Sequence, residues 1–352
     1  MSKIIQLPGL VDIHVHLRDP GQTHKEDFYT GTSSALAGGV TAVFDMPNNL
    51  TPIFTFEKLE EKIQIAKQKA VCDFGLYFGS IGDNTQLFGK VAKNVVGLKV
   101  YLSMTTGKYV VGDEELLERI FHEWPKQKII VVHAEGERVV LAINLSAKYK
   151  NRLHITHVST ADALERIIVA KKDKLNITCD VTPHHLFLTD NNLSKMKGFG
   201  IVKPFLATQA DLDYLWRNLD KVDCIASDHA PHTIEEKQSI AAPPGMPGLE
   251  TMLPLLLTAV SQKRVSLAEI IRLTNINPQK IFGFKQDKDT FVEVDMEEKY
   301  IINNKELLTK CGWSPFDGWK VQGKVKSVYI RGTKVFENGK ILVSPGFGEN
   351  II

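Results

Sequence analysis

This sequence has only four cysteines and no long apolar run, and both features limit the classes of protein to which it can belong. No run of 18 apolar residues is present, which argues against a membrane-spanning helix, and the first ten residues, MSKIIQLPGL, lack the apolar stretch of a signal peptide. None of the cysteines forms a C-x-x-C pair, so neither a thiolate zinc site nor a redox motif is indicated. We therefore expect a cytoplasmic protein with four reduced thiols, those of Cys72, Cys179, Cys224 and Cys311.

An excess of charge of one sign is missing as well. The chain has 43 Lys and Arg against 41 Asp and Glu, and no long run of like charge, so no nucleic-acid surface is indicated. No internal repeat or low-complexity tract is present. The 352 residues, 43% of them hydrophobic, are enough to bury a sizeable core in one large domain or two ordinary ones.

Short β-branched and apolar runs recur along the chain, and most are followed by a segment with helical periodicity. We predict strands at 9–16, 41–46, 72–79, 95–102, 129–134, 153–158, 176–181 and 222–228. Helical segments lie between them at 25–38, 55–69, 112–123, 135–149, 160–172 and 209–219, whereas the 79–95 connection gives only a poor helix. Eight strands that are apolar on both faces and joined by helical crossovers predict an α/β fold, a closed (β/α)8 TIM barrel.

The pattern of polar and apolar residues changes after about residue 300. The stretch KVKSVYIRGTKVFENGKILV alternates polar and apolar residues, and its Asn338-Gly339 pair is a β-hairpin signal. We therefore assign residues 9–300 to the barrel and expect the C-terminal part to form a small β-rich appendage.

Two histidines close the first predicted strand, in the stretch GLVDIHVHLRDPG. His14 and His16 are two positions apart, so in a strand their side chains project to the same face. A single histidine at a strand end is more often a hydrogen-bonded packing residue than a metal ligand. The His-x-His pair alone leaves both interpretations open.

Further polar residues fall at the ends of other predicted strands, and in a barrel of this kind those ends meet at one rim. A ring of buried imidazoles is costly unless each finds a partner, and metal ions provide one for all of them. We therefore predict a metal centre whose ligands are His14, His16, Lys99, His133, His157 and Asp228.

Lys99 is the informative member of this set. A plain ammonium would be repelled by two divalent ions, whereas a lysine that has taken up carbon dioxide carries a carbamate able to bridge them. The alternative is a lysine that pairs with a carboxylate at the rim. Imidazole and oxygen ligands suit Zn²⁺, with Mn²⁺, Co²⁺ or Ni²⁺ as substitutes. With Asp228 moving a proton from a metal-activated water to a leaving nitrogen, the predicted chemistry is hydrolysis of an amide-like bond.

Eight ordered motifs carry a family resemblance that runs from about residue 8 to the end of the chain. They are DIHVHLRDPG, GGVTAVFDMPN, GLKVYL, VVHAE, ITHVST, PHHLFL, ASDHAPHT and PPGMPGLETMLPLLLTAV. Together they resemble the dihydroorotases of the amidohydrolase superfamily. The pattern is most similar to the dihydroorotase domain of the animal multifunctional pyrimidine-synthesis protein, including the tail VSPGFGENII.

The resemblance implies the reversible hydrolysis of L-dihydroorotate to N-carbamoyl-L-aspartate in pyrimidine synthesis. It implies two Zn²⁺ per chain, bridged by an N6-carboxylysine at Lys99. One ion would be held by His14, His16, Lys99 and Asp228, and the other by Lys99, His133 and His157. It also implies that residues 1–8 and 301–352 form a reduced β-sandwich beside an amidohydrolase-type barrel.

The resemblance assigns Arg18, Asn48 and His232 to the substrate carboxylate and ring. A guanidinium fork matches a carboxylate, which agrees with that role for Arg18. The alternatives are an ion pair of Arg18 with Asp19 or Asp27, and a turn-forming role for Asn48.

Three further substrate contacts are implied by the resemblance: the backbone at Pro244, Thr105 in a mobile loop, and Lys203 where the family often has Arg or Asn. A third metal, known in the animal domain, is doubtful because Thr156 and Asp180 replace its cysteine and glutamate ligands.

Two rival interpretations remain at this point. Hydantoinases, dihydropyrimidinases and allantoinases share the two-metal barrel, but their substrates lack the carboxylate that the substrate set indicates. Some dihydroorotase-like chains have lost ligands and serve as structural partners, yet all six ligand positions are filled here. The resemblance allows two protein partners, a second copy of the chain and aspartate transcarbamoylase.

Overall fold

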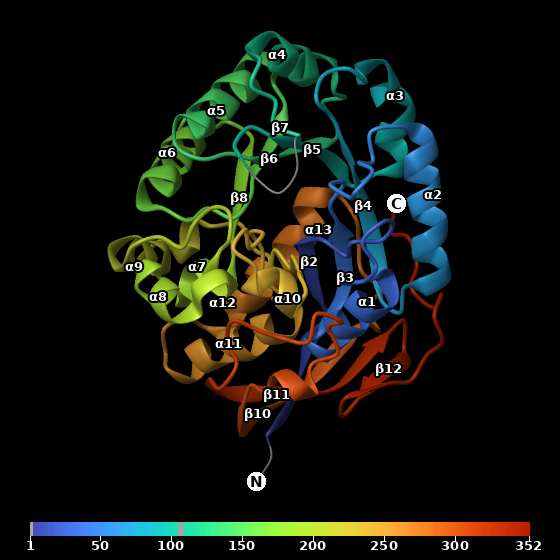
Figure 1. Ribbon diagram of the computed structural model, residues 1–352, viewed down its shortest axis with the longest axis vertical. Helices are drawn as coiled ribbons and strands as arrows, with labels where there is room; N and C mark the ends of the chain where they lie inside the picture. Colours follow the sequence, from blue (N-terminus) through green and yellow to red (C-terminus); the bar gives the residue numbers. More distant parts are fainter. Residues whose placement is uncertain (1–2, 105–108) are drawn as a thin grey trace.

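The computed structural model describes residues 3–104 and 109–352, and its centre is a barrel of eight parallel strands (Figure 1). The strands follow one another around the barrel in chain order, so helical crossovers on the outside join neighbours. Their bounds are β2 Leu10–Val15, β3 Val40–Asp45, β4 Asp73–Gly79, β5 Gly97–Tyr101, β6 Ile129–His133, β7 Arg152–Ile155, β8 Ile177–Val181 and β9 Cys224–Ile225. The eight predicted strands and the barrel are confirmed.

The longer helices lie around the outside of the barrel (Figure 1). They are α1 Phe28–Ala37, α2 Phe56–Lys69, α4 Glu114–Glu123, α5 Glu137–Tyr149, α6 Ala161–Lys172, α9 Gln209–Arg217 and α11 Leu249–Ser261. Several begin where a side chain accepts a hydrogen bond from a free N–H of the first turn, as Thr55 does for α2 and Thr160 for α6. The helical segments predicted between the strands are therefore confirmed.

Shorter helices occupy the remaining connections. They are α3 Phe88–Val91, α7 Pro183–Phe187, α8 Leu193–Met196, α10 Ile234–Gln238, α12 Leu267–Ile271 and α13 Asn277–Phe282. The connection from β4 to β5 holds only the four-residue α3 with single 3₁₀ turns on either side, as the poor helical pattern of 79–95 predicts.

Inside the barrel, apolar side chains fill one end and polar side chains gather at the other. Near the first end, the ring of Phe282 meets that of Phe44 edge to face, with centroids 5.0 Å apart. Near the C-terminal ends of the strands, Cα pairing places Tyr101 of β5 beside His133 of β6. The inward-facing polar residues therefore come together at one rim, as in other barrels of this class.

The last strand, β9, is only two residues long, and the barrel closes beyond it through the backbone. His16 N donates a hydrogen bond of 2.8 Å to the carbonyl of His229, and Val15 and His229 form a parallel bridge. Closure therefore brings the chain after β2 directly against the chain after β9.

The appendage is a single antiparallel sheet in the described residues, in the order β1-β10-β11-β12-β13. The strand bounds are β1 Ile4–Pro8, β10 Phe291–Ile301, β11 Lys320–Ile330, β12 Thr333–Glu337 and β13 Lys340–Ile341. The hairpin at 338–339 is confirmed, with positive φ angles at Asn338 and Gly339. The appendage expected as a reduced β-sandwich thus consists of one sheet.

The boundary expected at residue 300 differs from the observed sheet. Strand β10 begins at Phe291 and pairs with β1 and β11, so the segment 291–300 belongs to the small sheet and not to the barrel. The C-terminal tail, in turn, leaves the sheet and returns to β4, where Ile351 N donates to the carbonyl of Phe74. The division into two domains stays a prediction.

Two further findings bear on the expected environment of the chain. Within 3–104 and 109–352, no helix is long and apolar enough to cross a bilayer. The four cysteines are buried and form no disulfide.

Candidate metal centre and substrate site

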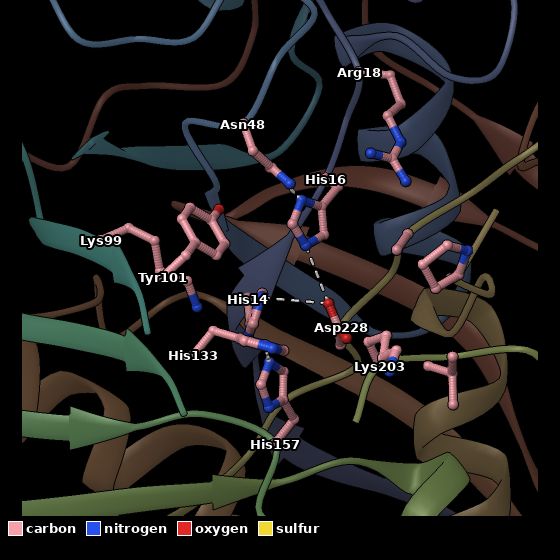
Figure 2. Close-up of a pocket in the computed structure, with 14 residues that line it drawn as sticks. His14, His16, Arg18, Asn48, Lys99, Tyr101, His133, His157, Lys203 and Asp228 are labelled. Atoms are coloured by element: carbon pink, nitrogen blue, oxygen red, sulfur yellow. Dashed lines mark hydrogen bonds and ion pairs between the residues drawn. The ribbon is translucent and has the colours of Figure 1, made fainter. Parts of the chain in front are cut away.

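A pocket opens at the C-terminal ends of the barrel strands, and it collects almost all of the side chains that the sequence singles out (Figure 2). Its walls are formed by His14, His16, Arg18, Asn48, Lys99, Tyr101, His133, His157, Val202, Lys203, Asp228, Ala230, Pro244 and Gly245. His232 lies immediately behind the wall, in contact with Arg18. Thr105 lies outside the described residues.

His14, His16 and Asp228 form the first cluster of possible metal ligands. Nε2 of His14 lies 3.3 Å, and Nε2 of His16 lies 3.1 Å, from Oδ1 of Asp228. The three ligand atoms all fall within 4.8 Å of one another, and the residues are buried. This is the spacing expected of atoms that share one ion.

Asn48 determines which nitrogen of His16 faces the cluster. Its carbonyl oxygen Oδ1 lies 2.7 Å from Nδ1 of His16, and because that oxygen can only accept, the ring donates from Nδ1. Nε2 of the neutral ring then carries a lone pair directed at a carboxylate oxygen. Two lone pairs that face each other at 3.1 Å need a proton or a metal ion between them, and the donor set of two imidazoles and a carboxylate fits a metal.

His133 and His157 form a second pair beside the first cluster. Nδ1 of His133 lies 2.9 Å from Nε2 of His157, and the rings of His14 and His157 have centroids 5.2 Å apart. The four imidazoles therefore form one continuous group around the pocket.

Three histidines of this group, His14, His16 and His157, are neutral. Burial lowers the pKa values of His14, His16 and His157 well below 6.5, and neighbouring cationic groups add to the effect. A neutral imidazole is the form that binds metal ions. The site therefore offers ligands that need not release a proton first.

Lys99 reaches the same space from β5. Its side chain is 1% exposed, and Nζ donates a 3.2 Å hydrogen bond to the hydroxyl of Thr156 rather than pairing with a carboxylate. Burial lowers the pKa of Lys99 from 10.5 to about 7. A substantial fraction of the amine is therefore neutral near pH 7, which is the form that reacts with carbon dioxide.

Two buried carboxylates hold the ligand-bearing backbone. Asp12 accepts hydrogen bonds from the N–H groups of His14 and Ser227, and so joins the two strands that carry the first cluster. Asp180 accepts from His157 N at 2.7 Å and pairs with His154 Nε2 at 2.8 Å. Both oxygens of Asp180 are thus engaged, which argues against a third metal there.

Arg18 is not paired with either of the nearby aspartates. Asp19 forms an ion pair with Lys69 at 2.7 Å, and Asp27 pairs with Lys310. Arg18 is instead 4% exposed, and its Nε donates to the carbonyl of Pro231 at 3.1 Å. The guanidinium therefore keeps part of its charged edge for an anion in the pocket.

Pro244 and Lys203 also line the pocket, and His232 lies behind them. Nη2 of Arg18 donates to Nε2 of His232 at 3.2 Å, and that nitrogen lies 3.2 Å from the carbonyl oxygen of Pro244. The ammonium of Lys203 lies 3.5 Å from the centroid of the Phe205 ring. The substrate residues expected from the sequence, Thr105 apart, are therefore close neighbours.

Lys237 holds this wall in place and was not singled out by the sequence. Its buried ammonium donates to the carbonyls of Ile201, Pro243 and Gly245 at 3.0, 2.8 and 2.9 Å. It thereby ties the loop of Lys203 to the loop of Pro244. No local sequence signal marks this role, because the three acceptors are brought together only by folding.

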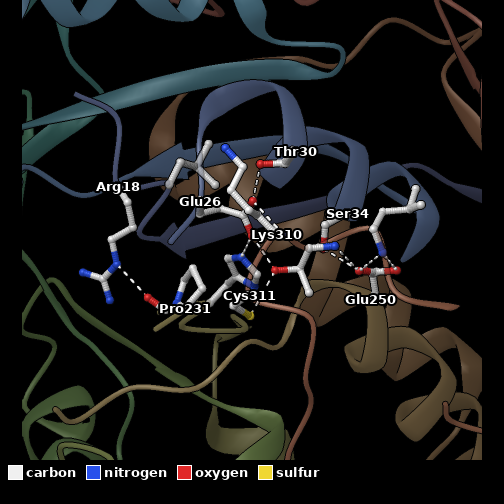
Figure 3. Close-up of polar contacts among 12 residues, drawn as sticks. Arg18, Glu26, Thr30, Ser34, Pro231, Glu250, Lys310 and Cys311 are labelled. Atoms are coloured by element: carbon white, nitrogen blue, oxygen red, sulfur yellow. Dashed lines mark hydrogen bonds and ion pairs between the residues drawn. The ribbon is translucent and has the colours of Figure 1, made fainter. Parts of the chain in front are cut away.

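A segment that follows the small sheet's strand β10 is anchored beneath the site by two buried carboxylates (Figure 3). Glu26 accepts from the backbone N–H of Lys310 and from the hydroxyl of Thr309, and it lies 3.3 Å from Nε2 of His229. Glu250 accepts from Leu308 N and Thr309 N at 2.9 Å each. Glu26 thus connects His229, the residue after Asp228, to a segment about 80 residues farther along the chain.

Known proteins match this chain, in sequence and in fold, over nearly the whole length of the chain. Residues 5–335 match the model of the amidohydrolase family. The chain is 44% identical to the multifunctional protein CAD of Squalus acanthias over 99% of its length, but it spans only 16% of that relative. It is 38% identical to dihydroorotase of Pyrococcus abyssi, covering 100% of this chain and 88% of the relative.

Among solved structures, L-hydantoinase from Arthrobacter aurescens superposes with a TM-score of 0.94 at 26% identity, over 99% of this chain and 89% of that one. The fold is thus shared with L-hydantoinase, while sequence identity is higher to the dihydroorotase of Pyrococcus abyssi. The resemblance seen in the motifs is confirmed.

Proposed function

The chain belongs to the amidohydrolase family and, within it, to the dihydroorotases, and on that premise we propose that it catalyses the reversible hydrolysis of L-dihydroorotate to N-carbamoyl-L-aspartate. The substrate assignment rests on the position of Arg18. This residue is buried at the pocket wall beside the metal ligands, and it forms no ion pair with an acidic side chain. A guanidinium in that position supplies the charge that a carboxylate-bearing ring requires.

We propose that two Zn²⁺ ions belong to the site. The donors that would hold one are His14, His16 and Asp228, and those for the other are His133 and His157, with the Lys99 carbamate common to both. When bound, such ions polarise an amide carbonyl and lower the pKa of water.

Lys99 would be prepared for its role by its own environment. Its neutral amine attacks the carbon of carbon dioxide, an N–C bond forms, and the proton of the nitrogen is released. The product is an anion with two oxygens, whose negative charge would offset the charge of bound metal ions. The support is the burial of the amine and the pKa of about 7 that results.

Asp228 would move the proton in this reaction. Burial raises the pKa of Asp228 from 3.8 to about 7, so its carboxylate can take up a proton and release it near neutral pH. It would accept the proton from the attacking water and deliver it to the ring nitrogen as the C–N bond breaks. The same steps in reverse order close the ring.

Arg18 would bind the substrate carboxylate, while His232, Asn48 and the backbone at Pro244 position the ring. Burial and the charges of Arg18 and Lys25 lower the pKa of His232 well below 6.5, so a neutral ring accepts the hydrogen bond from Arg18. The ammonium of Lys203 would contact the anion as well, and Thr105, outside the described residues, is proposed as a further substrate contact.

The test of the proposed function is an ultraviolet assay of purified, zinc-loaded protein in both directions. Dihydroorotate and carbamoyl aspartate are expected to interconvert, whereas hydantoin and dihydrouracil, which lack a carboxylate, are expected to stay unchanged. Turnover of a neutral ring with none of dihydroorotate would replace this function by that of a hydantoinase, which the similarity in fold favours.

We also propose a cytoplasmic location and two partners, a second copy of the chain and aspartate transcarbamoylase. Support comes from the free, buried cysteines and from the match to one part of a much longer multifunctional protein. Light scattering of the purified chain, alone and mixed with a transcarbamoylase, tests both partners.

A further inference from the structure

One polar group in the pocket has no role in the function proposed above. Tyr101 is the last residue of β5, two positions after Lys99 on the same strand, and its Cα pairs with that of His133. The side chain is 2% exposed and lines the pocket. Because it shares the face of the strand with Lys99, its ring lies among the metal ligands.

The hydroxyl of Tyr101 is buried and has no hydrogen-bond partner among the described residues. Figure 2 shows it directed toward Asn48 and His16, with Arg18 farther away beyond His16. Two other tyrosines differ, because the hydroxyl of Tyr77 donates to the carbonyl of Ile13 at 2.9 Å and that of Tyr109 donates to the carbonyl of Asn49 at 3.1 Å.

A buried hydroxyl without a partner costs free energy, and phenylalanine would fill the same volume without that cost. We therefore expect the hydroxyl of Tyr101 to form its hydrogen bond with a group of the bound ligand. At neutral pH a phenol is protonated, so it is able to donate.

The position of the hydroxyl decides which part of the substrate it meets. Arg18 holds the carboxylate at one side of the pocket, so the ring extends from there toward the metal ligands. The hydroxyl lies at that second side, between His16 and the strand that carries Lys99. The group of the ring that must reach this place is the amide carbonyl under attack.

We propose that the Tyr101 hydroxyl donates a hydrogen bond to the oxygen of the attacked amide carbonyl and stabilises the negative charge that develops on it. This makes Tyr101 a further catalytic residue, and the inference rests on the proposed function. A donor fixed in a buried site acts mainly in the transition state, because the oxygen is more negative there than in the substrate.

The test compares zinc-loaded Tyr101→Phe with wild-type protein and with Tyr77→Phe. For Tyr101→Phe, kcat is expected to fall about 100- to 1,000-fold with little change in KM, as for other single donors to a developing oxyanion. Its melting temperature and its content of two zinc ions are expected to stay at the wild-type values or, for the melting temperature, to rise. Tyr77→Phe removes a structural hydrogen bond, so its melting temperature is expected to fall and its kcat to stay unchanged.

Other results would overturn the proposal in distinguishable ways. An unchanged kcat in Tyr101→Phe removes the catalytic role, and a raised KM alone assigns the hydroxyl to ground-state binding. Loss of zinc or a lower melting temperature assigns it a structural role. If the wild type converts hydantoin or dihydrouracil instead of dihydroorotate, the proposed function has failed, and the same comparison made with that ring still decides the role of Tyr101. An enzyme that turns over none of these rings removes both proposals.

Discussion

Nδ1 of His133 and Nε2 of His157 face each other across 2.9 Å, although the two rings come from different strands and both are buried. Two imidazoles whose nitrogens meet in this way are typical of a metal site. Glu135 lies 3.4 Å from Nε2 of His133, so its contact is with the other nitrogen of that ring and not with the facing pair. We expect the anion shared by the two rings to come from Lys99 of β5, which lines the same pocket and becomes negatively charged when it carries a carbamate.

Substituting Lys99 by alanine is therefore expected to abolish tight binding of at least one metal ion. The second pair of histidines then loses the carbamate as a shared ligand, and no bridging anion would offset the repulsion between two cations. Metal content per chain after dialysis, measured by mass spectrometry, checks this. Uptake by metal-free wild-type protein should also be faster when bicarbonate is present. A variant that keeps two zinc ions per chain would refute the bridging carbamate.

Asp228→Asn is expected to remove turnover in both directions, with a loss of about 100-fold or more, because the amide neither accepts nor returns the proton at near-neutral pH. Initial rates with dihydroorotate and with carbamoyl aspartate, each at matched metal content, are the measurement. Because Asn keeps an oxygen at the ligand position, a variant with full metal and wild-type rates would show that the proton moves through another group.

Much of this site is predictable because its residues stand at the ends of strands. Runs such as IIVVHA and ITHVST predict a buried strand that ends in a polar residue. In a parallel barrel the C-terminal ends of the strands lie together at one rim. The positions of His133 and His157 follow from that rule without any knowledge of side-chain packing. The same rule predicts the place of Tyr101, because it lies two residues after Lys99 and therefore on the same face of the strand.

Other features depend on contacts between distant segments, which local patterns do not encode. Asp19 is adjacent to Arg18 in sequence, yet it pairs with Lys69, 50 residues away, and this leaves Arg18 for the pocket. Lys237 stands in the polar stretch TIEEKQS, which is typical of an exposed helix, but folding buries it among three carbonyls. The stretch FVEVDMEEKYI begins at Phe291 with the polar and apolar alternation of a strand that buries one face, and this alternation favours a barrel that ends before residue 291.

Arg18→Met is expected to raise KM for dihydroorotate by about 30- to 100-fold, the cost of losing charge-assisted hydrogen bonds to one carboxylate. Metal content should not change, because Arg18 bonds to Pro231 and His232 and to none of the metal ligands. Steady-state kinetics and metal analysis of the same preparation check both statements. Arg18→Lys, which keeps the charge without the fork, serves as the control and should lie between the two. Loss of metal in Arg18→Met would instead indicate a structural role.

The burial of Glu250 leads us to expect that the free energy of unfolding depends on pH for a reason unrelated to the metal site. Burial raises the pKa of Glu250 from 4.5 to about 7. Between these values the folded protein binds more protons than the unfolded chain, so this residue's contribution to stability falls as pH rises from 4.5 to 7 and is constant above. Ionised Glu250 therefore costs about 3 kcal/mol relative to a neutral side chain of the same shape.

Glu250→Gln keeps an oxygen in the position of Oε1, which accepts from Ser34, Leu308 and Thr309, and removes the charge. The free energy of unfolding of this variant, minus that of the wild type, is expected to rise by about 2–3 kcal/mol between pH 5 and pH 8. Urea denaturation at both pH values, with the same metal content, measures it. Glu306→Gln, an exposed carboxylate on the same segment, should show no such rise. An equal difference at the two pH values would mean that the ionised carboxylate is fully compensated by its three donors, and that Glu250 anchors the segment at no cost in charge burial.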